Sequence, residues 1–115
     1  MIYPIKMNKD NWSVLFLDHR VEREFLSLQP DMKANYWHVI SLIREFGSHN
    51  VGMPHIRFLG NKLWEIRIRG KNGLARAIYT IASDKKLIIL YVFIKKTPKT
   101  PQQAIEIALK RAKEV

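Results

Sequence analysis

Three strand-like segments in close succession constrain the fold more than any other feature of the sequence. Residues 62–69, 74–82 and 87–95 are rich in β-branched and aromatic residues, and the first alternates between apolar and polar side chains. The turn at 70–73 reads GKNG, whose residues tolerate positive φ. Because so few residues separate the segments, the sequence predicts an antiparallel meander.

One strand and two helices precede the meander. The run WSVLFLD at 12–18 consists mainly of β-formers, and residues 19–28 place apolar side chains at helical spacing behind Asp18, a candidate N-cap. A longer apolar stripe at helical spacing runs through residues 32–46. Pro30 disfavours helix in the residue before it, so it separates the two helices, which we expect to form a helical hairpin.

The helix ends and the connector complete the predicted order. Asp31 suits the N-cap of the second helix. Thr100, Pro101 and Gln103 form a capping-box pattern at the start of a last helix, with Thr100 as its N-cap. Residues 48–61 read as a connector with two glycines and one proline. The order is β-α-α-β-β-β-α, an α+β fold in which the helical hairpin covers one face of a four-stranded sheet and the other face is only partly covered.

Composition bounds the class of protein. The 115 residues are 47% hydrophobic and contain no cysteine, which fits a single domain spanning 1–115 in a reducing compartment. The N-terminal residues lack the pattern of a signal peptide, and no apolar run approaches the roughly 18 residues of a membrane span. We therefore expect a cytoplasmic protein that does not enter a membrane.

The net charge of +10 is concentrated in one segment. Residues 57–99 hold eleven Lys or Arg and two Asp or Glu, whereas residues 1–56 hold six of each kind. Concentrated positive charge favours a polyanionic partner, either nucleic acid or an acidic protein. The alternative is a solvated surface on which the charge serves solubility.

Strand alternation predicts that much of this charge lies on one face of the sheet, because successive side chains point to opposite faces. Simple alternation in the last strand gives an apolar face of Ile88, Leu90, Val92 and Ile94. The other face of the sheet then collects basic and aromatic side chains: Arg67, Arg69, Arg76, Tyr91, Phe93 and Lys95. Such a face suits RNA or single strands, since cations hold phosphates and rings stack on unpaired bases. A plain solvent-facing side of an antiparallel sheet is the alternative.

Several motifs in sequence order resemble a known family. They are PHIRFLGNKLWEIRIR at 54–69, GLARAIYTI at 73–81 and KLIILYVFIKKTPKTPQQAIEIALKRAKE at 86–114. Together they closely resemble the phage-derived Gp49-like, HigB-type branch of the RelE/ParE toxin superfamily, over about residues 12–115. The resemblance implies a RelE-like fold and the toxin of a type II toxin–antitoxin pair, with a helix-turn-helix antitoxin as its usual partner.

The resemblance also implies an activity. HigB and RelE relatives cut mRNA in the ribosomal A site, so ribosome and mRNA are the expected partners, whereas ParE-type relatives poison DNA gyrase. The basic residues and the aromatic hydroxyl of LYVFIKK favour an endoribonuclease. A gyrase inhibitor, or a degenerate module that only binds RNA or a partner, is the alternative.

The implied reaction uses no metal ion or other cofactor. The RNA 2′-OH attacks the adjacent phosphate, which gives a 2′,3′-cyclic phosphate and a 5′-OH and needs a base, cations and a proton donor. By position in the motifs, the catalytic candidates are Arg76, Lys95, Tyr91 and Arg67. The candidates for RNA binding are Arg69, Lys96, Lys71, Phe93, Lys99 and Arg57.

The identity of the general base stays open. Close relatives carry His where this chain has Tyr91, and a tyrosine with its ordinary pKa of about 10 is a poor base unless cations lower that pKa. A lysine of lowered pKa is the other candidate. Glu65 is either a base or, as we favour, an ion-pair partner that orients the arginines. The four histidines lack metal-ligand spacing, and His55 is expected to order its loop.

Overall fold

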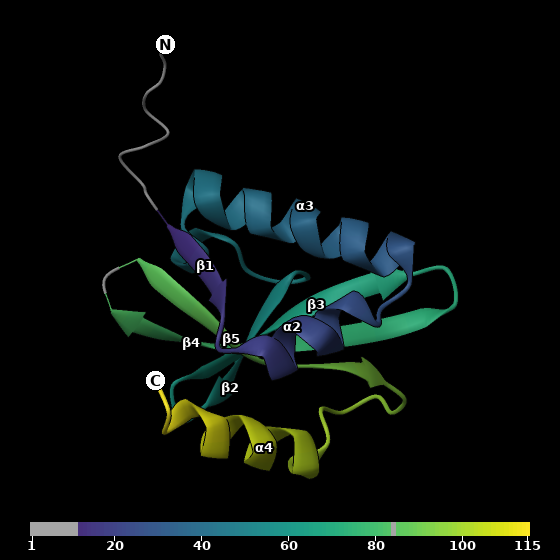
Figure 1. Ribbon diagram of the computed structural model, residues 1–115. Helices are drawn as coiled ribbons and strands as arrows, with labels where there is room; N and C mark the ends of the chain where they lie inside the picture. The colour runs from purple at the N-terminus through teal and green to yellow at the C-terminus, as the bar shows by residue number, and fades with distance from the viewer. Residues whose placement is uncertain (1–11, 84) are drawn as a thin grey trace.

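The computed structural model describes residues 12–83 and 85–115 and has an α+β fold, as the sequence predicts (Figure 1). The first eleven residues of the predicted domain 1–115 lie outside this description. The elements in chain order are β1 (Ser13–Phe16), α2 (His19–Leu26), α3 (Pro30–Phe46), the 3₁₀ turn η1 (Ser48–Asn50), β2 (Ile56–Gly60), β3 (Leu63–Gly70), β4 (Gly73–Ser83), β5 (Lys86–Lys95) and α4 (Gln102–Ala112).

The described strands form one mixed sheet in the order β1-β5-β4-β3-β2. Strands β2 to β5 form an antiparallel meander, and the predicted meander of β3, β4 and β5 is confirmed. Strand β1 joins the edge of β5 in parallel. Helices α2 and α3 lie on one side of the sheet and α4 lies on the other (Figure 1).

The prediction that residues 48–61 form only a connector is wrong, because they contain the edge strand β2. Ile56 pairs with Ile66 and Phe58 with Trp64, and the register shifts before Gly60. The strand has only five residues, ends in Gly60 and begins shortly after Pro54, so its own sequence resembles a loop. Pairing with β3 holds β2 in the extended conformation, so the sheet of the described residues has five strands where four were predicted.

The predicted helix caps have mixed outcomes. Asp18 caps α2 as predicted, since its carboxylate accepts a hydrogen bond from the Arg20 backbone N–H at 2.9 Å. Helix α3 begins one residue before Asp31, at Pro30, whose fixed φ and missing N–H suit the first helical position. The Asp31 carboxylate instead accepts from the backbone N–H of Lys71 at 2.6 Å, which ties the helix to the β3–β4 turn.

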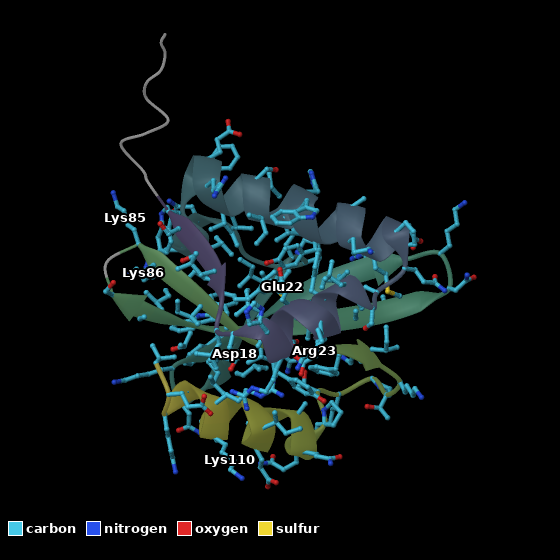
Figure 2. All side chains as sticks on the ribbon, in the orientation of Figure 1. Asp18, Glu22, Arg23, Lys85, Lys86 and Lys110 are labelled. Atoms are coloured by element: carbon cyan, nitrogen blue, oxygen red, sulfur yellow. The ribbon has the colours of Figure 1, made fainter. Side chains whose placement is uncertain are left out.

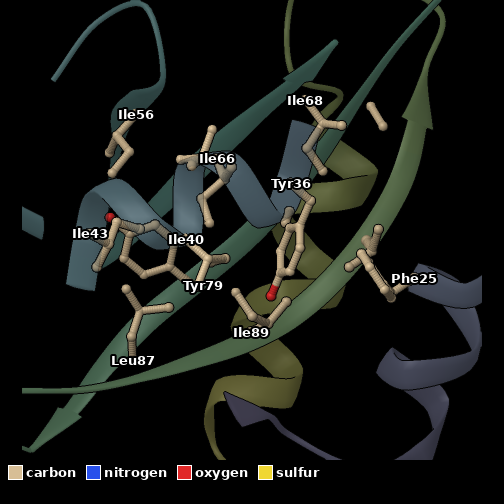
Figure 3. Close-up of a cluster of buried hydrophobic side chains, with 14 of the residues drawn as sticks. Phe25, Tyr36, Ile40, Ile43, Ile56, Ile66, Ile68, Tyr79, Leu87 and Ile89 are labelled. Carbon is tan, nitrogen blue, oxygen red and sulfur yellow. The ribbon is translucent and has the colours of Figure 1, made fainter. Parts of the chain in front are cut away.

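The core has one layer on each side of the sheet. Beneath α2 and α3, Phe25, Tyr36 and Ile43 pack against side chains of the central strands (Figure 3). The strand residues of this layer that Figure 3 labels are Ile56, Ile66, Ile68, Tyr79, Leu87 and Ile89. The second layer is smaller and lies under α4, where Ala104 and Ala108 meet Leu63, Ile78, Ile88 and Leu90.

The predicted apolar face of β5 is wrong in its detail, because the strand contains a bulge. Ile78 pairs with Tyr91 but the next residue, Tyr79, pairs with Ile89, so Leu90 is an extra residue in the ladder. A bulge of this kind reverses the alternation beyond it. Ile88 and Leu90 therefore pack under α4, whereas Ile89 and Val92 pack on the side of α3.

Candidate functional site

The strand register brings the predicted basic and aromatic side chains onto one face of the sheet, on the side of α4. Arg76 lies directly opposite Arg67 in β3 and opposite Phe93 in β5. Tyr91 and Lys95 share that side with Phe93, two residues away in each direction. Arg57 of β2 adds a further cation, since it pairs with Glu65. We call the set Arg57, Arg67, Arg69, Arg76 and Lys95 the cationic face.

Two members of the cationic face are buried and the others form a rim. Arg76 is only 1% exposed and Lys95 is 8% exposed. Arg67 is partly buried, and its guanidinium lies 3.8 Å from the Met53 sulfur. The exposed candidates for RNA binding are Arg57, Arg69, Lys71, Lys96 and Lys99. The site thus has a buried centre of positive charge and an accessible basic border.

A single buried carboxylate lies within the cationic face. Glu65 is 0% exposed, and its Oε2 lies 3.6 Å from Nε of Arg76. Within the described residues, neither of these two atoms has a hydrogen-bond partner. The other oxygen, Oε1, accepts a hydrogen bond from the Thr100 hydroxyl at 2.7 Å. This geometry supports the ion-pair role for Glu65, with Arg76 as its partner.

The hydrogen bond from Thr100 also corrects the prediction for the last helix. Helix α4 starts at Gln102 with Pro101 before it, and no side chain caps its N-terminus. Thr100 is not the N-cap, because Pro101 occupies that position, and the Thr100 hydroxyl donates to the Glu65 carboxylate in β3. Sequence reasoning missed this contact, since nothing near Thr100 in the chain points to strand β3.

The surroundings of Lys95 lower its pKa. Burial lowers the pKa of Lys95, and the neighbouring Arg76 lowers it further, whereas Glu65 raises it. The Nζ atom donates a hydrogen bond to the carbonyl oxygen of Pro98 at 2.6 Å. Burial likewise lowers the pKa of Arg76, while Glu65 opposes that shift. Lys95 therefore meets the requirement for a lysine base better than an exposed lysine does.

Tyr91 is fixed between β5 and α4. Its ring stacks on Phe93 with centroids 5.1 Å apart, and the Arg111 guanidinium lies 5.1 Å from the Tyr91 centroid. Arg111 also donates to the Leu90 carbonyl oxygen at 2.9 Å and pairs with Glu24 of α2 at 3.0 Å. The partly buried Arg111 is thus a structural link that sequence reasoning missed. Lys110, by contrast, points away from the sheet on the outer side of α4 (Figure 2).

His55 contributes its backbone to the site. Its carbonyl oxygen accepts a hydrogen bond from the Arg67 N–H at 2.8 Å, and its ring lies 6.1 Å from that of His38. Among residues 12–83 and 85–115, no group of three or more His, Asp or Glu is placed to hold a metal ion. No described helix is both long enough and apolar enough to cross a membrane.

Comparison with known proteins agrees with this fold. The family described as Phage derived protein Gp49-like (DUF891) matches residues 23–113. The chain belongs to this family. The Gp49-like protein is also similar in structure to a chain of the archaeal RelE–RelB complex from Pyrococcus horikoshii OT3, with a TM-score of 0.51 and 20% identity. The match covers 72% of this chain and 93% of that one, and it shows a RelE-like fold.

The predicted Gp49-like family and the predicted RelE-like fold are thereby confirmed. No curated protein matches the Gp49-like protein in sequence.

Proposed function

We propose that this Gp49-like protein is the toxin of a type II toxin–antitoxin pair and cuts mRNA on the ribosome. One observation carries the proposal: five cations from strands β2 to β5 lie on a single face of the sheet that holds one buried carboxylate. Like charges directly opposite each other, as at Arg67 and Arg76, destabilise a sheet. Such an arrangement suits a ligand with concentrated negative charge, and a phosphodiester in RNA is that ligand.

The site supports attack by the RNA 2′-OH on its own phosphate. Lys95, as the neutral amine, takes the proton from the 2′-OH. The arginines stabilise the negative charge that builds on the phosphorane oxygens. As the bond from phosphorus to the 5′-oxygen breaks, Tyr91 donates a proton to that oxygen. The products are a 2′,3′-cyclic phosphate and a 5′-OH, and the reaction invokes no metal ion.

Exposed cations of the cationic face, of the β3–β4 turn and of the segment after β5 fit the proposed partners. Arg57, Arg69, Lys71, Lys96 and Lys99 are free to contact phosphates of mRNA and of the ribosome, and such contacts position a nucleic acid without reading its sequence. The similar archaeal protein was solved as a RelE–RelB complex, which supports an antitoxin partner for this chain too. We propose a helix-turn-helix antitoxin whose acidic segment covers the cationic face, in the cytoplasm.

Paired alanine variants test the assignment of the site. Arg76→Ala with Lys95→Ala removes both buried cations and should abolish mRNA cleavage on programmed ribosomes and growth arrest. The matched control is Arg44→Ala with Lys86→Ala, which removes two exposed cations outside the cationic face. The control should cleave like the wild type. Circular dichroism must show both proteins folded, and a folded double variant that stays fully toxic would contradict the site.

The pH dependence tests Lys95 as the base. Because burial lowers its pKa below the ordinary value of 10.5, the cleavage rate should rise with pH and level off below that value. Lys95→Arg keeps the charge but holds its proton at every accessible pH, so it should lose the rate at all of them. A Lys95→Arg protein with the wild-type rate profile would remove Lys95 from the mechanism.

A further inference from the structure

The buried carboxylate of Glu65 is the one charged group of the site that the reaction above does not use. It lies on the cationic face, and among the described residues around Arg76 it is the acidic group that raises the arginine's pKa. A buried charge is costly unless it is paired, so both the carboxylate and the guanidinium depend on each other.

The two oxygens of Glu65 serve different parts of the site. Oε2 faces Nε of Arg76, which lies on the neighbouring strand β4. Oε1 accepts from Thr100, which lies in the connection between β5 and α4. The carboxylate therefore links Arg76 of β4 to the β5–α4 connection, and in the chain the whole of β5 lies between these two.

The connection that Thr100 belongs to also holds Lys95. Nζ of Lys95 donates to the carbonyl oxygen of Pro98, two residues before Thr100. The hydrogen bond from Thr100 to Glu65 therefore restrains the loop whose Pro98 carbonyl oxygen accepts from the Lys95 amine. Arg76 and Lys95 are placed relative to each other through one carboxylate, although they lie on different strands.

We propose that Glu65 is the positioning residue of RNA cleavage: one oxygen orients Arg76, and the other anchors the β5–α4 connection that holds Lys95. The inference rests on the proposed function for its kinetic consequence. It assigns Glu65 no proton transfer and no contact with RNA, because the side chain is fully buried and both of its oxygens face protein groups.

Two variants separate the two halves of this role. Glu65→Gln removes the charge that Arg76 faces but keeps an oxygen that can accept from Thr100. Thr100→Val keeps the charge and removes the anchor. Thr97→Val is the matched control, because Thr97 lies in the same connection and its hydroxyl donates only to the Lys99 carbonyl oxygen.

Single-turnover cleavage on programmed ribosomes, measured against protein concentration, separates the maximal rate from half-saturation. Misplacement of a catalytic group by about 1 Å can cost about 100-fold in rate. Glu65→Gln should lower the maximal rate by about 10- to 100-fold, with half-saturation unchanged. The pH profile should keep its rising limb but move to lower pH, because the charge that raises the pKa of Lys95 is lost. Thr100→Val should lower the maximal rate by a smaller factor, and Thr97→Val should match the wild type.

Three results would overturn the proposal. Loss of the rising limb of the pH profile in Glu65→Gln would make Glu65 the general base. An unchanged rate would leave it without a role in cleavage. A fall in rate that only follows the fraction of unfolded protein would make the carboxylate purely structural.

A nuclear magnetic resonance measurement needs no RNA, so it tests the positioning of Arg76 by Glu65 independently of the proposed RNA cleavage. The chemical shift of the Arg76 Nε–H signal should change in Glu65→Gln, because the carboxylate charge 3.6 Å from Nε is lost, and should stay at its wild-type value in Thr100→Val. A signal that is unaffected by Glu65→Gln refutes the positioning of Arg76. If the wild-type protein cuts no RNA but the signal behaves as expected, the proposed function fails while the coupling of Glu65 to Arg76 stands.

Discussion

The buried pair of Glu65 and Arg76 gives the sharpest prediction, because one partner can be replaced alone or both can be replaced together. Arg76→Met takes away the cation and leaves a carboxylate that is 0% exposed. Breaking a buried ion pair in this way costs about 3–5 kcal/mol. Lys95 also interacts with Glu65, so some positive charge remains near the carboxylate. We therefore expect Arg76→Met to lower the free energy of unfolding by about 3 kcal/mol, near the lower end of that range.

The loss is large on the scale of a small domain. For a chain of this length, each kcal/mol lowers Tm by about 4 °C, so Arg76→Met should melt about 12 °C below the wild type. Replacing both partners, by Glu65→Leu with Arg76→Met, leaves no unpaired charge between them, and such replacements are often neutral. The double variant loses the bond from Thr100 as well, so we expect it within about 1–2 kcal/mol of the wild type.

Urea unfolding of the wild type, both single variants and the double variant measures the coupling. The account requires the double variant to be more stable than Arg76→Met, and to remain inactive because Arg76 is absent. Additive losses, equal within about 0.5 kcal/mol to the sum of the single variants, would show that the two side chains do not depend on each other. An active double variant would show that Arg76 serves stability alone.

Two further predictions concern the fold. Gly70→Ala would place a Cβ 2.6 Å from Cγ of the buried Met32, so thermal unfolding should show a loss of about 1–3 kcal/mol, whereas Gly52→Ala, which meets nothing within 4 Å, should lose far less. Burial raises the pKa of Tyr36 and Tyr79 above the ordinary value of 10.0, so their contribution to stability is complete below that pH and is lost as pH rises above it. Urea midpoints should fall between pH 10 and 11, and a flat profile there would contradict the buried, neutral tyrosines.

The meander and its basic face were predictable because local signals fix them. The GKNG turn at 70–73 sets the pairing of β3 with β4, and this register places Arg67 opposite Arg76. Alternation then carries the charged side chains to one side of the sheet. The aromatic residues of β5 were assigned correctly for a different reason, because Tyr91 and Phe93 both follow the bulge at Leu90.

The features that the sequence did not predict depend on pairing and packing partners that the local sequence does not reveal. The bulge at Leu90 exists only in the ladder with β4, and β2 is a strand only because β3 pairs with it. Arginine is mostly exposed in proteins, so nothing local indicates that Arg76 is buried. The bond from Thr100 to Glu65 likewise joins residues that are 35 positions apart.

The central claim is that the cationic face cuts mRNA on the ribosome. Primer extension on a defined mRNA, incubated with the purified protein with and without programmed ribosomes, tests it most directly. We predict cuts at defined codon positions that appear only with ribosomes and leave a 2′,3′-cyclic phosphate. No cuts in either reaction, from protein that still arrests growth, would contradict the claim and direct the search to DNA gyrase.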